Sequence, residues 1–236
     1  MTYTAVGSAH SQTLSRGIRV LEILAEARGP LTITELSSAL GVHRSIAYRI
    51  LRTLEDHGLV TRDPAGRISL GSRLAALARS VAHDLQAAAL PELTAVANEL
   101  GMTAFLVVLD RRECITLVSV EPRHAVVTVA QRPGTRHPLA VGAPGLAIQS
   151  SLSDSEWEAF AAGEQPRAEA AVAHSSGFAT SHDEVIPGMS SVAVPLRIPG
   201  HAPAAIAVVF VASDRPVEAL AARLTDAAAA VSRDLQ

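Results

Sequence analysis

The sequence predicts an α+β fold in two domains, and three observations support that prediction. Residues 15–57 carry the apolar spacing of three short helices, and two short β-rich runs follow them. From residue 103 onwards, β-rich runs alternate with helical segments, as in an antiparallel sheet with helices packed on it. The charge also changes sign: residues 1–80 hold ten arginines and six acids, a net +4, whereas the remainder holds ten arginines and seventeen acids, a net −7. The basic N-terminal third therefore suits a polyanionic partner.

The composition is that of a globular protein and excludes several other classes. With 48% hydrophobic residues, 18% charged residues and a mean hydropathy of +0.26, the chain can bury a core. The most apolar run, 204–212, is far shorter than the roughly 20 residues of a spanning helix, and residues 1–12 lack the features of a signal peptide. The lone Cys114 excludes an internal disulfide and a multi-cysteine zinc site. We therefore expect a cytoplasmic protein without a membrane partner.

The first two helices are predicted from apolar spacing and capping signals. The first covers Ser15–Ala27 and ends at Gly29-Pro30. Thr32 and Glu35 have the T-x-x-E spacing of a capping box, which should open a second helix that runs to Leu40. The inward face of the first helix is predicted to hold four apolar residues: Ile18, Leu21, Leu24 and Ala25.

The third helix is predicted from about Arg44 to His57, after a tight turn at Gly41-Val42-His43. Its inward residues are Ala47, Ile50, Leu51 and Leu54. Its outer face combines cations with hydrogen-bonding groups on an element slim enough for the DNA major groove, as a recognition helix requires. The residues on that face are Arg44, Ser45, Tyr48, Arg49 and Arg52.

Two short strands, residues 59–62 and 67–70, are predicted to form a hairpin across residues 63–66. They carry Arg62 and Arg67, so the hairpin can lie along a phosphate backbone as a wing. An alternative is a helical module that binds a protein partner and leaves its arginines solvated, but spacing, exposed face and wing together favour DNA. For Arg49 two roles stay open, DNA contact and bracing of the fold.

A connecting helix is predicted over Arg73–Ala89, and a second helix should open at Pro91 and end at Gly101. Strands are expected over residues 103–109 and 114–120, joined as a hairpin, and a third over 126–131. Three helices should follow, over 143–151, 156–162 and 167–174. The remaining elements are strands 190–198 and 204–211 and a closing helix 217–235 that buries Leu220, Leu224, Ala228, Val231 and Leu235.

Several of these runs resemble one known family. The stretches R-G-I-R-V-L-E-I-L, T-I-T-E-L-S-S-A-L-G-V and S-I-A-Y-R-I-L-R-T-L-E-D-H-G-L-V are similar in order and spacing to the IclR family of bacterial transcription regulators. R-H-P-L-A-V-G-A-P-G-L-A and G-F-A-T-S-H-D-E-V-I-P-G-M-S-S-V-A-V-P resemble the effector domain of that family. The resemblance implies a flexible tail (1–13), a winged helix-turn-helix domain (14–72), a linker helix (73–90) and a GAF-like effector-binding domain (91–236).

The resemblance also places a candidate effector site. It implies an anion-binding helix start at Ala143 and Gly145, but Pro144 between them has no N–H, so part of that anion cradle is missing. Members that sense small oxoacids carry polar residues at four further positions, and the family usually carries a lysine where this chain has Leu146. Three of these five positions are apolar in this chain: Leu146, Val208 and Phe210. We therefore expect an aromatic or otherwise lipophilic effector, with or without one carboxylate or hydroxyl. A vestigial pocket and a ligand site elsewhere remain alternatives. The four positions are Ser181, Ser191, Val208 and Phe210.

No residue pattern points to catalysis, a cofactor or a metal. Cys114 opens an apolar strand without a neighbouring motif, so we expect a buried inert thiol. His182, Asp183 and Glu184 are consecutive in an extended loop and point in different directions, which favours solvation or capping over a metal site. The sequence also lacks a phosphate loop, a dinucleotide fingerprint and a nucleophile elbow. We therefore predict a protein that is not an enzyme.

The expected partners are operator DNA and a small-molecule effector. Base contacts are expected from Arg44, Ser45 and Tyr48, and phosphate contacts mainly from Arg52 and the wing. One module with so few cations binds weakly at physiological salt, so two copies on a near-palindromic site are expected. The resemblance implies a homodimer, leaves a tetramer open, and implies association with the nucleoid when DNA is bound.

Overall fold

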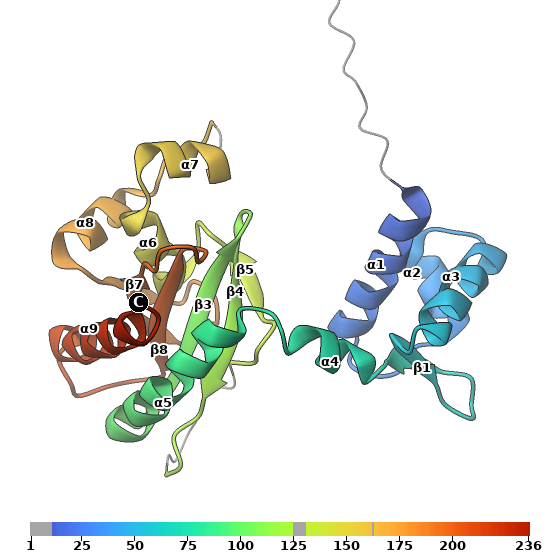
Figure 1. The fold of residues 1–236 in the computed structure, drawn as a ribbon, viewed down its shortest axis with the longest axis horizontal. Coiled ribbons are helices and arrows are strands. Elements are labelled where there is room, and N and C mark those ends of the chain that lie inside the picture. Colours follow the sequence, from blue (N-terminus) through green and yellow to red (C-terminus); the bar gives the residue numbers. More distant parts are fainter. Residues whose placement is uncertain (1–10, 125–130, 162) are drawn as a thin grey trace, which may run out of the picture. The chain divides into compact units, whose positions relative to one another are not determined.

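The computed structural model describes residues 11–124, 131–161 and 163–236, and the chain divides into two compact units, residues 1–81 and 82–236 (Figure 1). The described part of the N-terminal unit contains the three helices and the antiparallel hairpin that were predicted, followed by a fourth, short helix. Leu31 also pairs with Ile68, which ties the start of the second helix to the hairpin. The elements are α1 (Gln12–Glu26), α2 (Ile33–Leu40), α3 (Arg44–Asp56), β1 (Val60–Arg62), β2 (Ile68–Leu70) and α4 (Arg73–Ala78).

The core of the N-terminal unit confirms the predicted inward face of α3, because Ala47, Ile50, Leu51 and Leu54 are all buried. The predicted inward face of α1 is partly wrong. Leu24 is buried and Leu21 half-buried, but Ile18 is 50% exposed and Ala25 also faces solvent, whereas Gly17 and Val20 are buried. Apolar residues occur on both faces of α1, so spacing alone does not choose between them. Gly17 lies against α3, where a Cβ would make only an ordinary van der Waals contact with Ile50 Cγ2, at 3.9 Å.

Local capping explains where α2 and α3 begin. The capping box is confirmed: Thr32 Oγ1 accepts from Glu35 N at 3.2 Å, and Thr32 N donates to Glu35 Oε2 at 2.7 Å. Gly41, with φ of 66°, makes the turn that α2 and α3 share. His43 then caps α3, since its Nδ1 accepts from Ser45 N at 3.3 Å.

The single connecting helix predicted over Arg73–Ala89 is wrong. α4 ends at Ala78, and α5 (His83–Leu100) begins after Ala82, whose φ of 45° is left-handed. Residues 79–81 are exposed, so burial does not hold this part of the chain helical. Pro91 lies inside α5 instead of opening it. Burial of the preceding turn, with Leu85 and Ala89 fully enclosed, offsets the hydrogen bond lost at Pro91.

The described residues of the C-terminal unit form a six-stranded sheet in the order β5-β4-β3-β8-β7-β6, in which every neighbouring pair is antiparallel. The predicted hairpin and the two late strands are confirmed. β5 and β6 were not predicted, and the expected strand over 126–131 falls largely on residues 125–130, outside the described part. The strands are β3 (Thr103–Asp110), β4 (Glu113–Val120), β5 (Arg136–Pro138), β6 (Ala179–His182), β7 (Ser190–Leu196) and β8 (Ala204–Phe210).

Helices cover both faces of this sheet (Figure 1). α5 and α9 (Val217–Asp234) enclose one apolar core with alternate residues of the central strands. Of the five residues predicted to face inward from α9, four are buried and Leu235 is partly buried. α6 (Gly142–Ser151) and α8 (Ala168–Ser176) enclose the second core, and side chains of α7 (Asp154–Ala161) pack against it. None of the described helices is long and apolar enough to cross a membrane.

Candidate nucleic-acid interface and effector site

The outer face of α3 forms one continuous exposed surface. We call its five residues, Arg44, Ser45, Tyr48, Arg49 and Arg52, the recognition surface; all five are exposed, and Tyr48 is 51% exposed. Four of them, all except Arg52, line an open hollow with His43. The Ser45 hydroxyl lies 2.9 Å from His43 Nδ1, so the cap of α3 also orients a polar group of this surface.

The arginines of the recognition surface differ from those of the wing. Within the described residues, Arg44, Arg49 and Arg52 form no ion pair with a carboxylate. No side-chain hydrogen bond in the described part braces Arg49 to the fold either. In the wing, Arg62 Nε donates to Glu55 at 2.8 Å and Arg67 Nε donates to Asp63 at 3.0 Å. The wing cations are therefore already partly neutralised inside the unit, whereas those of α3 face solvent.

A small cavity in the C-terminal unit lies at the start of α6. Its volume is about 30 Å³, roughly the space of one water molecule. Pro144, Ser181 and Ser191 line it, with apolar side chains of β3, β8 and the loop after β6. We call this the effector cavity. Two predicted residues support its wall: Ala143 N donates to Ser181 Oγ at 2.9 Å, and a Cβ on Gly145 would lie only 2.3 Å from Leu139 O.

Two predicted effector residues lie elsewhere. Val208 is fully buried on the other face of the sheet, in the core shared with α5 and α9, and Phe210 packs against that same core. Val209 lines the effector cavity instead. Successive side chains of a strand point to opposite faces, so an alignment shifted by one residue selects the wrong face. Val208 and Phe210 therefore do not line the effector cavity.

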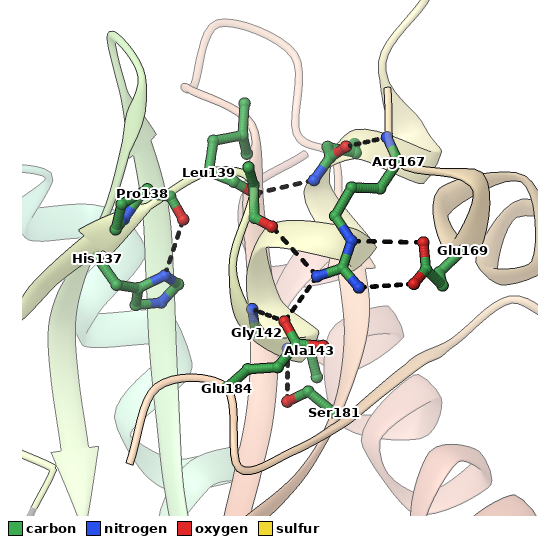
Figure 2. Close-up of polar contacts among 11 residues, drawn as sticks. His137, Pro138, Leu139, Gly142, Ala143, Arg167, Glu169, Ser181 and Glu184 are labelled. Atoms are coloured by element: carbon green, nitrogen blue, oxygen red, sulfur yellow. Dashed lines mark hydrogen bonds and ion pairs between the residues drawn. The ribbon is translucent and has the colours of Figure 1, made fainter. Parts of the chain in front are cut away.

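An ion-pair network fixes the start of α6 (Figure 2). Glu184 Oε2 accepts from Gly142 N at 2.8 Å and from Arg167 Nη1 at 2.6 Å. Arg167 also donates to Ala140 O at 3.2 Å and makes two hydrogen bonds to Glu169. One arginine thus joins the loop after β6, the segment before α6 and the first turn of α8.

The pKa shifts follow from this network. Burial raises the pKa of Glu184, but the hydrogen bonds from Arg167 and Gly142 N outweigh it, so the net pKa is lowered. The hydrogen bonds to Glu169 and Glu184 raise the pKa of Arg167. His137, another lining residue, has a pKa lowered by burial and is neutral at neutral pH.

The remaining reactive groups behave as structural residues. Cys114 is buried on β4, and burial raises the pKa of its thiol to about 12, which confirms the predicted buried thiol. His182 Nε2 lies 3.1 Å from Asp183 Oδ2, whereas Glu184 turns towards Arg167. The capping role weighed for this triplet therefore holds for Glu184. The described residues contain no group of three side chains placed to bind a metal ion.

Two family models match the chain. The IclR helix-turn-helix domain matches residues 13–64, and the bacterial transcriptional regulator IclR C-terminal domain matches residues 78–233, more than half of the chain. The chain belongs to the IclR family. It is therefore an IclR-type DNA-binding transcription regulator, as its sequence predicts.

Individual relatives agree with the IclR assignment. The chain is 30% identical to the glycerol operon regulatory protein of Streptomyces griseus, over 95% of this chain and 96% of that protein. It is 29% identical to the HTH-type transcriptional regulator XynR of Escherichia coli (strain K12), a match that spans 65% of this chain but only 62% of that protein. An IclR transcriptional regulator from Alicyclobacillus acidocaldarius has a TM-score of 0.82 at 30% identity, covering 96% of this chain and 100% of that one. An IclR homologue from Microbacterium hydrocarbonoxydans, complexed with 4-hydroxybenzoate, has a TM-score of 0.80 at 26% identity, covering 94% and 98%.

Sequence reasoning missed several residues that shape the effector cavity of this IclR protein, and three of them show why. Arg167 was predicted only as the start of a helix, because its partner Glu184 lies 17 positions away and only the fold brings the two together. His137 lies on the three-residue strand β5, too short to show alternation. Val209 could have been found from strand parity, because Ser191 is its direct cross-strand partner.

Proposed function

We propose that this IclR-type regulator reads its operator with the recognition surface of α3. Arg44, Ser45 and Tyr48 contact base edges, while Arg52 holds phosphates and Arg49 lies beside them. The observation that carries this proposal is the set of three exposed α3 arginines without a carboxylate partner in the described residues. Such cations gain the most from phosphates, because no internal ion pair is lost when DNA binds.

The wing arginines contribute less in this proposal. Arg62 and Arg67 must share or exchange their carboxylate partners before they can hold a phosphate. With three arginines on each α3 that lack a carboxylate partner among the described residues, one copy binds DNA weakly at physiological salt. A homodimer on a near-palindromic operator therefore fits the charge count, and a tetramer is a further possibility of the same arrangement.

The experiment compares Arg52→Ala with Tyr48→Ala on DNA selected from a random library. Arg52→Ala should weaken binding to all sequences and reduce the salt dependence by about one phosphate contact per half-site, whereas Tyr48→Ala should change sequence preference. Arg19→Ala is the matched control, since Arg19 is exposed on α1 and already paired with Glu22 at 3.0 Å. If neither α3 substitution alters DNA affinity, a protein-binding N-terminal module becomes the better explanation.

For the C-terminal unit, the proposed effector is aromatic or otherwise lipophilic and binds in the effector cavity. Apolar side chains of Phe105, Ile186, Met189 and Val209 line this cavity, and a related IclR protein is complexed with 4-hydroxybenzoate. The cavity of about 30 Å³ is smaller than ligand sites of roughly 300 Å³ and more, so its walls must move apart when a ligand of that size enters.

A thermal-shift screen of the full chain tests this effector class. Aromatic acids, phenols, phenolic amides, terpenoid acids and short oxoacids are compared, because a ligand that prefers the folded state raises the melting temperature. Stabilisation only by short oxoacids would contradict the lipophilic class. A ligand controls DNA binding only if it binds the DNA-competent and incompetent states differently, and residues 73–90 are the proposed route between the units.

A further inference from the structure

The start of α6 has no backbone N–H left for a ligand. An α-helix leaves its first four N–H groups without intrahelical partners, which makes its N-terminus an anion site. In this helix, Gly142 N and Ala143 N donate to the chain's own side chains, as described above. Val141 N donates to a backbone carbonyl at 3.0 Å, and Pro144 has no N–H. All four positions are therefore accounted for within the described chain.

Glu184 fills the place that a ligand anion would take. Its carboxylate receives a helix N-terminal N–H and the Arg167 guanidinium, the two kinds of donor that bind anionic ligands in proteins. The side chain lines the effector cavity and is only 25% exposed. We propose that Glu184 is a built-in anionic ligand of the effector site and that the effector is consequently an uncharged molecule that donates a hydrogen bond. The second half of this proposal rests on the proposed effector cavity.

The local charge explains why a carboxylate ligand is disfavoured. Arg167 is shared by Glu169 and Glu184, so the group of three already carries a formal charge of −1. His137 is neutral and adds no cation. A second carboxylate would face Glu184 in a partly buried site, where like charges repel more strongly than in water.

The acceptors that remain define the favoured ligand. Both hydrogen bonds described at Glu184 end on Oε2, which leaves Oε1 to accept from a donor. Ser181 Oγ lines the same cavity and has further acceptor capacity besides its bond from Ala143 N. A phenol, an alcohol or a primary amide on an apolar body meets both the donor requirement and the apolar lining.

The first test is chemical rescue of Glu184→Ala in the full chain. Propionate carries the carboxylate and the methylene carbon that the substitution removes, and it is one methyl group longer. We expect Glu184→Ala to lower the melting temperature and propionate to raise it again in a saturable way, with no such effect of propionamide. The wild-type chain, at equal ionic strength, should show no saturable shift. Glu169→Ala is the matched control, because Glu169 binds the same arginine but does not line the cavity.

Either of two results would contradict the proposal that Glu184 is a built-in anionic ligand. One is equal stabilisation of the wild-type chain by propionate, which would mean that the anion position is open. The other is a folded Glu184→Ala chain that propionate does not stabilise.

A second variant, Glu184→Gln, keeps the side-chain volume and removes the charge, so it serves even if Glu184→Ala does not fold. The probes are 4-hydroxybenzamide and 4-hydroxybenzoate, measured by calorimetry. The wild-type chain should bind the amide at least about tenfold more tightly, and Glu184→Gln should remove most of that preference. Equal or tighter binding of 4-hydroxybenzoate by the wild-type chain would contradict the uncharged effector. If neither probe binds either chain, the aromatic effector class fails, while the propionate result still decides the role of Glu184.

Discussion

The arginines of the recognition surface and the arginine beside the effector cavity differ in their ion pairing. Arg44, Arg49 and Arg52 lie exposed on α3 and lack a carboxylate partner in the described residues, whereas Arg167 holds two carboxylates and a backbone carbonyl. An unpaired cation on a helix is available to an external anion such as a phosphate. An arginine whose donors are already bound, such as Arg167, instead holds neighbouring segments of its own chain together. The comparison teaches that exposed arginines remain available to a polyanion, as proposed for α3, whereas an arginine paired within its own unit does not, as proposed for the effector cavity.

The largest expected effect is on the free energy of unfolding, which should fall when Arg167 is replaced but not when Arg52 is replaced. Arg167→Ala leaves Glu184 and Glu169 without their shared partner and should destabilise the C-terminal unit by about 2–3 kcal/mol. This is below the roughly 3–5 kcal/mol of a fully buried pair, because the Arg167 side chain is 30% exposed. Arg52→Ala should stay within about 0.5 kcal/mol of the wild-type stability. Urea unfolding of both variants checks the difference, and equal stability losses would remove the contrast.

The next effect tests which face of β8 belongs to the effector cavity. Val208→Thr places a hydroxyl in the closed core under α5 and α9 and should cost about 1–2 kcal/mol. Val209→Thr places the same hydroxyl beside the cavity, opposite Ser191, and should cost less than about 1 kcal/mol. The two substitutions are matched in size and chemistry. A larger loss for Val209→Thr in denaturant unfolding would argue against the assignment of the two faces.

Val208 and Val209 also show how well the sequence predicts which side chains belong to each of the two sites. The inward face of α3 and its exposed arginines follow from a 3.6-residue period, which tolerates an error of one or two residues at a helix end. A strand has a period of two, so the shift from Val209 to Val208 exchanged the two faces of the sheet. The capping box of α2 was predictable because its residues are three apart. The Arg167–Glu184 pair was not, because its residues are distant in sequence.

The break between α4 and α5 shows a second limit. One left-handed residue, Ala82, interrupts a segment whose apolar spacing and alanine content both favour one continuous helix. Helix propensity is a weak local preference, and residues 79–81 are exposed, so no core contact fixes the direction of the chain there. Strand β5 is too short to show alternation, and β6, with four residues, is little longer.

A smaller effect concerns Arg62 and Arg67 of the wing. Each has one carboxylate partner, so their pairing is intermediate between that of the α3 arginines and that of Arg167. Asp63→Asn removes the charge that pairs with Arg67 but keeps an oxygen for the 2.8 Å hydrogen bond from Arg67 N. The wing arginine then becomes as available as those of α3. DNA affinity at low salt should rise, and the salt dependence should steepen by about one counterion per half-site. Binding isotherms at several salt concentrations check this, and an unchanged slope would mean that Arg67 does not reach DNA.

The smallest effect compares two capping boxes, one in each unit. Glu35 caps α2 through Thr32, and Glu156 caps α7 through Ser153. The backbone N–H of Thr32 lowers the pKa of Glu35. The backbone N–H of Ser153, a hydrogen bond from Arg197 and the Ser153 hydroxyl lower the pKa of Glu156 to about 2. Both pKa values are depressed on folding, so each box stabilises the folded state above the ordinary pKa of 4.5 and loses that contribution as the pH falls towards the folded value.

Side-chain carboxyl NMR during an acid titration measures the two residues separately. Glu156 should titrate furthest below 4.5, because it has an arginine partner that Glu35 lacks among its pKa-shifting neighbours. Arg197→Gln should raise the midpoint of Glu156 and leave that of Glu35 unchanged. A shift of both midpoints would show that the charge acts through the whole molecule and not through the local pair. The two carboxylates therefore differ as the arginines do. Glu35 is held by Thr32 alone, whereas Glu156 is held by Ser153 and also by the opposite charge of Arg197.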